Sequence, residues 1–557
     1  MNKFLNIVIL LITFSLTACS NTPNSVTMTV AQGQCVQTSQ YRGVTPNFQN
    51  LIESNPTTTT PYCLAVTVQN NNTGLNANNV QITSSGLQVS YLNFSSNSES
   101  TAQLFDSAAA GVTVSTATQT VNNLILFDPY NCVTTSGAQV LVLGMGGGTC
   151  TFYLQENGEN SPVGVFPYSL TYNYTNGNAN YSVTSTFNQR TTLYGGASNG
   201  LNSVTANIVN NTLNPFTNQI QWQPVSGATE SQATYGLTRS KYGIVYFATG
   251  NTVYQYNGLT ITPVGNPLSE SSSSIINLAL DATGNLFAGT NGQGLFVNQF
   301  ATESTWTQLT TNEITATSNI LGLKSTTSNG NTLLYVIEST NGYNCPYTNN
   351  PPSIICNTTI PRRGNTIFLQ NALDVDSSGN LYFGGLLTTN LNLYSYVYGN
   401  NFVTPFQSQS PISQKNNGTI GAVLYNPFNT ESGIYFSLSA NESSESSVYS
   451  CSQSSCNPVL SESGNPLGTL PPSATGNVNT LTNDGYGNLY ASGNTLYSAD
   501  WVGNESTFTP YYPISAALLF GNSVTYGGGN WIPIFPANGT SSQEIFSTIV
   551  ATTLTSY

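Results

Sequence analysis

No histidine occurs among the 557 residues of this chain. Histidine is the usual general base near neutral pH, and it completes the Ser-His-Asp and Cys-His nucleophilic systems. Its absence excludes those systems, together with metal sites built on imidazole ligands. The remaining residues form no recognisable catalytic constellation. The sequence therefore predicts a protein that is not an enzyme and that uses no cofactor.

Charged residues are also scarce, at 6% of the chain, with 9 Lys and Arg against 22 Asp and Glu and a net charge of −13. So few cations cannot build a surface that follows a phosphate backbone, which argues against nucleic acid as a partner. Solubility must come from neutral Asn, Ser and Thr side chains.

The first 19 residues have the pattern of an export signal. A basic start at Lys3 precedes an apolar stretch, Leu5 to Leu16, that is too short for a permanent transmembrane anchor. It ends in Leu16-Thr17-Ala18-Cys19, which resembles the lipobox of bacterial lipoproteins. This resemblance implies acylation of the Cys19 sulfur and anchoring on a membrane face. Ser20 resembles the residue of the outer-membrane class. The alternative is an ordinary secretory signal with a coincidental cysteine.

Eight of the nine cysteines remain once Cys19 is set aside. An even number in an exported protein predicts disulfides. The cysteines fall into couples that are close in sequence, so we expect nearest neighbours to pair. Zinc is the rival interpretation, but the chain has no CxxC pair and no histidine to support it. The candidates are Cys35, Cys63, Cys132, Cys150, Cys345, Cys356, Cys451 and Cys456.

Short runs of Val, Ile, Leu, Tyr, Phe and Thr alternate with clusters of Gly, Asn, Ser and Pro along the mature chain, which predicts an all-β fold. The run 64–74, followed by 80–82, resembles the opening of bacterial immunoglobulin-like modules. Residues 168–174 and 179–187 flank an Asn-Gly turn, the strongest short-range hairpin signal. We therefore predict a β-sandwich over 29–195, after a linker at 20–28.

A repeat organises the second part of the chain, residues 222–557, after a predicted linker at 196–221. Its clear copies are LALDATGNLFAG at 278–289, LDVDSSGNLYFG at 373–384 and LTNDGYGNLYASG at 481–493. With weaker copies, the repeated glycines lie 34 to 54 residues apart. Such spacing, with several strands in each repeat, predicts a β-propeller, and seven copies predict seven blades. An irregular stack of hairpins or a β-helix is the alternative.

The repeat resembles two families of propellers. Residues 373–384 look like an NHL-type repeat. Residues 286–309 resemble the Asp-box repeats of sialidase-like and sortilin-like propellers, although the aspartate expected before Trp306 is missing. These likenesses imply a fold and not a function, since propellers have many unrelated activities.

Two pairs of charged residues are candidate sites. Asp374 and Asp376 are two residues apart on a strand that runs into a turn, where D-x-D-x-x-G could hold calcium. Arg362 and Arg363 form the one doubled cation of the chain and could bind an anion. The alternatives are a turn-capping aspartate and a solvated loop, respectively. Neither pair carries enough ligands for a metal assignment, and we predict none.

The composition and the resemblances together predict a lipid-anchored protein of the cell envelope, on the outer membrane, that binds or scaffolds a protein partner without catalysis. A carbohydrate-active enzyme using propeller carboxylates is one alternative, and a surface adhesin for glycans is another. Sialidase activity needs three arginines around the substrate carboxylate, whereas Arg362 and Arg363 are adjacent and so face opposite sides of a strand.

A Cys19→Ser variant tests the anchor. Without the sulfur that receives the lipid, the protein should leave the membrane fraction and appear in the soluble fraction of the envelope, because no other membrane-binding segment is predicted. Fractionation with immunoblotting measures this change. A variant that stays as firmly membrane-bound as the parent contradicts the lipoprotein assignment.

Overall fold

The structure is a computed structural model that describes residues 26–34, 62–92, 123–127, 141–156 and 163–204, and much of 220–556, with short gaps inside these ranges. Cys19, Cys35, Cys132, Arg362 and Arg363 lie outside the described residues, as does the side chain of Cys63. The expectations for these residues stay predictions.

The described elements are β-strands, apart from one 3-10 turn at Gln299–Ala301, so the predicted all-β class is confirmed. Within the described part of the chain, no helix has the length and apolar character needed to cross a bilayer.

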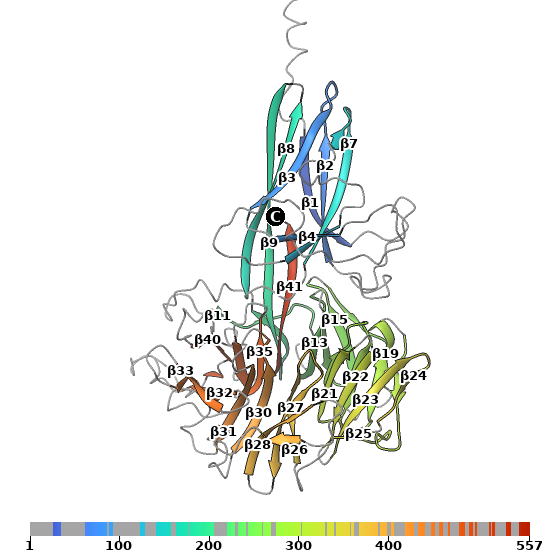
Figure 1. The fold of residues 1–557 in the computed structure, drawn as a ribbon, viewed down its shortest axis with the longest axis vertical. Coiled ribbons are helices and arrows are strands. Elements are labelled where there is room, and N and C mark those ends of the chain that lie inside the picture. Colours follow the sequence, from blue (N-terminus) through green and yellow to red (C-terminus); the bar gives the residue numbers. More distant parts are fainter. Residues whose placement is uncertain are drawn as a thin grey trace, which may run out of the picture.

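Two sheets make up the N-terminal body, at the upper end of Figure 1. Val66 and Val68 in the first sheet are fully buried and alternate with less buried neighbours, as expected for strands with one face on a core. The first sheet has the order β1 (Val26–Gln34), β2 (Tyr62–Asn70), β7 (Gly148–Glu156), β5 (Asn123–Phe127), β4 (Gln88–Leu92). The second contains β6 (Leu141–Leu143), β3 (Ala77–Ser85), β8 (Gly164–Asn176) and β9 (Ala179–Ala197). The hairpin predicted around the Asn-Gly turn is β8–β9.

Five antiparallel sheets follow one another along the chain, each built from consecutive strands. Their bounds are β13 (Thr234–Arg239), β14 (Val245–Thr249), β15 (Thr252–Tyr256), β16 (Ile261–Pro263); β17 (Ile275–Leu280), β18 (Leu286–Thr290), β19 (Leu295–Asn298), β20 (Thr307–Leu309); β21 (Gly322–Ser328), β22 (Asn331–Ile337), β23 (Gly342–Asn349), β24 (Pro352–Ile354), β25 (Thr358–Thr359); β26 (Ile367–Val375), β27 (Leu381–Leu387), β28 (Asn390–Tyr396), β29 (Val403–Pro405); β30 (Gly418–Tyr425), β31 (Ile434–Ala440), β32 (Ser447–Cys451), β33 (Cys456–Leu460), β34 (Pro466–Leu467).

A further sheet combines strands from distant parts of the chain in the order β35 (Val478–Asn483), β36 (Leu489–Gly493), β39 (Ser515–Leu518), β40 (Trp531–Phe535), β11 (Ile220–Gln221). A small pair, β37 (Leu496–Tyr497) and β38 (Tyr512–Pro513), lies between β36 and β39 in sequence.

The first strands of these sheets form a closed ring. β13 contacts β17, and the contacts continue through β21, β26, β30 and β35 to the last strand, β41 (Ile545–Ser556), which contacts β13 in turn. Sheets whose first strands surround an axis in this way define a β-propeller. The architecture predicted for the second part of the chain is therefore a propeller (Figure 1).

β41, which closes the ring, pairs with β9, a strand that also belongs to the N-terminal body. The first part of β9 pairs with β8, and its last residues, Phe187 to Ala197, pair with β41. β10 (Gly200–Val204) and β12 (Gln223–Pro224) extend this sheet beyond β9. β10 therefore falls inside the predicted linker at 196–221. The two bodies are joined by a continuous strand ladder, because β9 is long enough to serve both.

Glycines allow neighbouring sheets of the propeller to approach closely. A Cβ on Gly322 of β21 would lie 2.5 Å from Leu373 of β26, and one on Gly384 of β27 would lie 2.9 Å from Ile420 of β30. Each branched side chain thus fills the space that the glycine of the preceding sheet leaves free. Close packing of this kind has no room for an added methyl group.

Two predicted disulfides are present in the structure. Cys345 pairs with Cys356, and Cys451 pairs with Cys456. Both pairs are nearest neighbours in sequence, as expected. Cys150 is also disulfide-bonded. Disulfides persist in oxidising compartments, which places this protein outside the cytoplasm.

An Ala551→Asp substitution tests whether β41 holds the molecule together. Ala551 is 1% exposed and packs against Val245 and Phe247 of the first propeller sheet. An unpaired carboxylate buried there should lower the free energy of unfolding by about 3 kcal/mol or more, as measured by denaturant titration. Ser182→Asp, at an exposed position of β9, is the matched control and should change stability by less than about 0.5 kcal/mol. If both variants lowered the free energy of unfolding by the same amount, the assigned role of β41 in closing the propeller ring would be contradicted.

Candidate functional site

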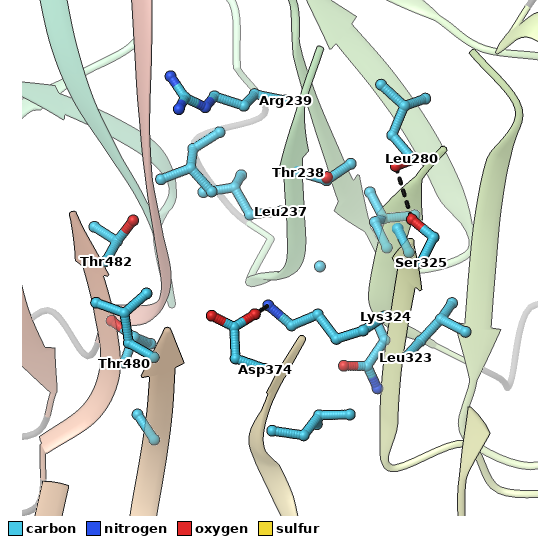
Figure 2. Close-up of a pocket in the computed structure, with 18 of the residues that line it drawn as sticks. Leu237, Thr238, Arg239, Leu280, Leu323, Lys324, Ser325, Asp374, Thr480 and Thr482 are labelled. Atoms are coloured by element: carbon cyan, nitrogen blue, oxygen red, sulfur yellow. Dashed lines mark hydrogen bonds and ion pairs between the residues drawn. The ribbon is translucent and has the colours of Figure 1, made fainter. Parts of the chain in front are cut away.

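A cavity of about 350 Å³ lies on the propeller axis, lined by the inner strands β13, β17, β21, β26, β30, β35 and β41. We call it the axial cavity. Figure 2 shows its lining, with side chains converging from strands that are far apart in sequence. The ring of inner strands creates this space because each sheet contributes one strand to the axis.

An ion pair spans the axial cavity between neighbouring sheets. The Lys324 Nζ of β21 lies 3.0 Å from the Asp374 Oδ1 of β26, and Figure 2 shows the two side chains pointing toward each other. The other carboxylate oxygen, Oδ2, accepts a hydrogen bond of 2.8 Å from the backbone N–H of Tyr425 on β30. Asp374 is thus fixed by the sheets on both sides of its own.

Lys324 is the more accessible partner of the pair. Its side chain is 43% exposed, against 16% for Asp374. A partly solvated ammonium group can contact a ligand without first breaking a buried bond, whereas the carboxylate is held by two donors. The lysine is therefore the member of the pair that is available for recognition.

The rest of the lining is polar but mostly neutral. Arg239 lines the upper part of the axial cavity as drawn in Figure 2, and hydroxyl groups come from Thr238, Thr480 and Thr482. Ser325 donates a 2.8 Å hydrogen bond to the carbonyl of Leu280. Among the described lining residues, two cations, Arg239 and Lys324, and one carboxylate give a net charge of +1 (2 − 1), whereas the whole chain carries −13. The cavity is locally favourable to an anionic or polar group.

The lining limits the chemistry that the axial cavity can perform. Asp374 is the one carboxylate among its described lining residues. Glycoside hydrolysis by the usual route requires two opposed carboxyl groups. The described lining thus offers charge and hydrogen-bonding groups for recognition without a second carboxyl for acid–base work.

Asp376, the second acidic candidate, has a different environment from Asp374. Its Oδ1 accepts hydrogen bonds from the backbone N–H groups of Ser378 and Asn380, at 2.9 and 2.8 Å. Its Oδ2 accepts from the Asn380 amide at 2.8 Å and from the Tyr382 hydroxyl at 3.1 Å. Burial and the Asp376 carboxylate raise the pKa of Tyr382, so this hydroxyl remains a proton donor. Asp376 therefore caps the turn.

The same turn occurs two sheets earlier, between β17 and β18. Asp281 accepts from the backbone N–H groups of Thr283 and Asn285, at 2.9 and 2.8 Å. The glycines of the two turns have positive φ, 94° at Gly284 and 83° at Gly379, a backbone conformation that glycine adopts readily. In the described part of the chain, no three Asp, Glu or Cys side chains are grouped as metal ligands. Asp374 and Asp376 have separate partners and do not form a shared ligand set.

Sequence reasoning found Asp374 but not the residues around it. Lys324 belongs to a repeat without the Asp-Gly-Asn turn, so no motif marked its strand. Tyr425 contributes a backbone group, which leaves no trace in side-chain patterns. Aligning the inner strands of all repeats, in place of their turns, would have placed Lys324 and Asp374 at the same axis.

No protein-family model matches the chain, and no curated protein matches it. Similar solved structures include the extracellular domain of the putative one-component system BT4673 from B. thetaiotaomicron, at 12% identity and TM-score 0.35, covering 62% of this chain and 44% of that one. Another is a protein from Lactobacillus plantarum, at 12% identity and TM-score 0.41, covering 65% and 99%. A third is YCF48 bound to a D1 peptide, at 10% identity and TM-score 0.33, covering 54% and 90%.

The chain thus spans less than half the length of the BT4673 domain. The TM-scores of all three structures are low, so we base the propeller assignment on the strand pairing and on the closed ring of inner strands.

An Asp376→Ala variant tests the structural assignment of this carboxylate. Loss of an acceptor shared by two backbone amides and two side chains should lower the free energy of unfolding by about 2–3 kcal/mol. Lys324→Gln, which removes a half-exposed partner of an ion pair, should lower it by less than about 1 kcal/mol. Thermal unfolding of the parent should not change with added calcium. A calcium-dependent rise that Asp376→Ala abolishes would instead identify a metal site.

Proposed function

We propose that this protein is a lipid-anchored binding protein of the outer membrane, held by Cys19, whose propeller contacts a protein partner without catalysis. In this proposal the N-terminal sheets are an immunoglobulin-like sandwich that acts as a spacer. The ring of inner strands is a seven-bladed propeller, whose last blade is β41 with β9, β10 and β12.

The continuous strand β9 is the observation that carries the proposal. It spans 19 residues, roughly 60 Å at about 3.3 Å per residue, and it is paired along its length by β8 or β41. A spacer joined in this way cannot bend freely at the junction. The propeller would therefore be presented at a fixed distance and orientation from the anchored end.

The propeller face away from the N-terminal body favours contact with a partner. The connection between β20 and β21 is ordered by its own hydrogen bonds, for example from the Ile314 N–H to the Thr311 hydroxyl at 2.9 Å. It is also bonded to the β18–β19 turn, where the Gly294 N–H donates to the Ser318 carbonyl at 2.8 Å. Surfaces that are ordered before binding lose little conformational entropy when they bind.

The axial cavity supplies a specific feature within this surface. Its net positive charge among neutral hydroxyl groups favours an acidic side chain or a terminal carboxylate of the partner. A glycan is the second candidate ligand, because the same hydroxyl groups and the exposed Lys324 ammonium could bind sugar hydroxyls.

A crosslinked pull-down from membranes of the native host, with the full-length protein, tests this function. We expect a partner protein to be recovered with the parent and its yield to fall in the double variant Arg239→Glu/Lys324→Glu, because both cations of the axial cavity are replaced by carboxylates. Arg190→Glu is the matched control, since Arg190 is an exposed cation on β9 outside the cavity.

Thermal unfolding of the double variant establishes that it is folded. Equal recovery of the partner with the double variant and with the parent would contradict the use of the axial cavity. Recovery of no partner, together with turnover of a glycan by the parent, would favour the carbohydrate-active alternative.

A further inference from the structure

Two loops at the end of the N-terminal body away from the propeller expose apolar side chains. We call them the tip loops: residues 70–77 between β2 and β3, and residues 143–148 between β6 and β7. Leu75 is 42% exposed and Met145 is 59% exposed. They are two of the four large exposed hydrophobic residues in the described part of the chain, the others being Ile355 and Val397. Figure 1 shows β2, β3 and β7 reaching this end.

Hydrogen bonds hold the tip loops against each other. The side-chain amide of Asn70, which is fully buried, donates to the carbonyls of Leu75 and Leu143, both at 3.0 Å. The Met145 N–H donates to the Asn76 side chain at 3.0 Å. The two apolar side chains are therefore displayed on an ordered backbone, and their exposure is not a consequence of a loose loop.

The backbone of the second loop depends on glycine. Gly146 and Gly147 have φ of 76° and 109°, and a Cβ on Gly148 would lie 2.6 Å from the backbone of Gly144. Met145 is the one residue between Gly144 and Gly148 that has a side chain, so the turn displays a single long apolar group.

The first described strand begins at the same end of the molecule. β1 begins at Val26, which pairs with Asn70 at the base of the first tip loop. Val26 lies seven positions after Cys19, and seven residue steps span at most about 25 Å when fully extended. A lipid on Cys19 would therefore hold the tip loops close to the bilayer surface.

The charge of the tip loops also suits a membrane surface. Residues 70–77 and 143–148 contain no Asp, Glu, Lys or Arg, although the chain as a whole carries −13. Anionic lipid headgroups repel carboxylates within about a Debye length. A tip without carboxylates avoids this repulsion.

We infer that Leu75 and Met145 insert into the interfacial region of the bilayer that carries the Cys19 lipid. This inference rests on the proposed anchor. The lipid supplies the membrane affinity, and the tip loops set the orientation, with β9 directed away from the bilayer and the propeller at the far end. Two apolar side chains cannot anchor the protein alone, because bilayer affinity scales with the apolar area that is buried.

Photolabelling in vesicles tests the inference. The full-length lipidated protein is reconstituted into phosphatidylethanolamine–phosphatidylglycerol vesicles that contain a diazirine lipid, and the labelled peptides are mapped by mass spectrometry. We expect label on the peptides that contain Leu75 and Met145. Leu75→Ser/Met145→Ser should lose this label while it floats with the vesicles as the parent does. Ile355→Ser/Val397→Ser, at the two exposed positions of the propeller, should keep it.

The outcomes separate the two proposals. If the protein floats with the vesicles but its tip loops carry no label, the docking inference is wrong and the lipid anchor is unaffected. The same conclusion follows if the tip loops crosslink to a second copy of the protein in place of lipid. A Cys19→Ser protein that floats as well as the parent overturns the anchor, and the docking inference with it.

Discussion

The pairing of β41 with β9 is the interaction on which the remaining structure depends. It joins residues 545–556 to residues 187–197, across most of the length of the chain. Its backbone hydrogen bonds close the ring of propeller sheets and, through the contacts of β41 with β1, β2 and β7, bring the same strand against the N-terminal body. One sheet belongs to both bodies, because β9 pairs with β8 of the N-terminal body and with β41 of the propeller ring. We expect the two to unfold as one cooperative unit, because loss of the shared ladder exposes both cores.

Charged residues are scarce in this chain, and several of its carboxylates have structural roles inside the propeller. Asp281, Asp376 and Asp484 are all at least 90% buried, and each accepts hydrogen bonds at or near a turn. Asp484 also accepts from the Val163 N–H of the N-terminal body at 3.2 Å. The carboxylates of Asp281 and Asp376 accept hydrogen bonds from backbone N–H groups of their own turns. Their structural use leaves Asp374 as the acidic group that faces the axial cavity.

The proposed anchor, spacer and contact surface follow one direction through the molecule. The tip loops and the start of β1 lie at one end, β9 runs through the middle, and the propeller lies at the other end (Figure 1). In such a protein, the paired strands fix where the contact surface lies relative to the lipid anchor. Since a paired ladder resists bending, the orientation of the contact surface becomes a property of the fold.

The sequence by itself determined the strand class, the repeat of the propeller, the β8–β9 hairpin and the two disulfides between near neighbours. All of these depend on alternation, turn chemistry or short spacing, which are local in the chain. Only the tertiary structure decided that the predicted linker contains a strand, that Lys324 meets Asp374, and that the loop of Leu75 is hydrogen-bonded to the loop of Met145. Each of these joins residues distant in sequence, because sheets pair strands through backbone groups that carry no residue-specific signal. A pattern along the chain therefore specifies the strands, and the closure of the ring specifies the site.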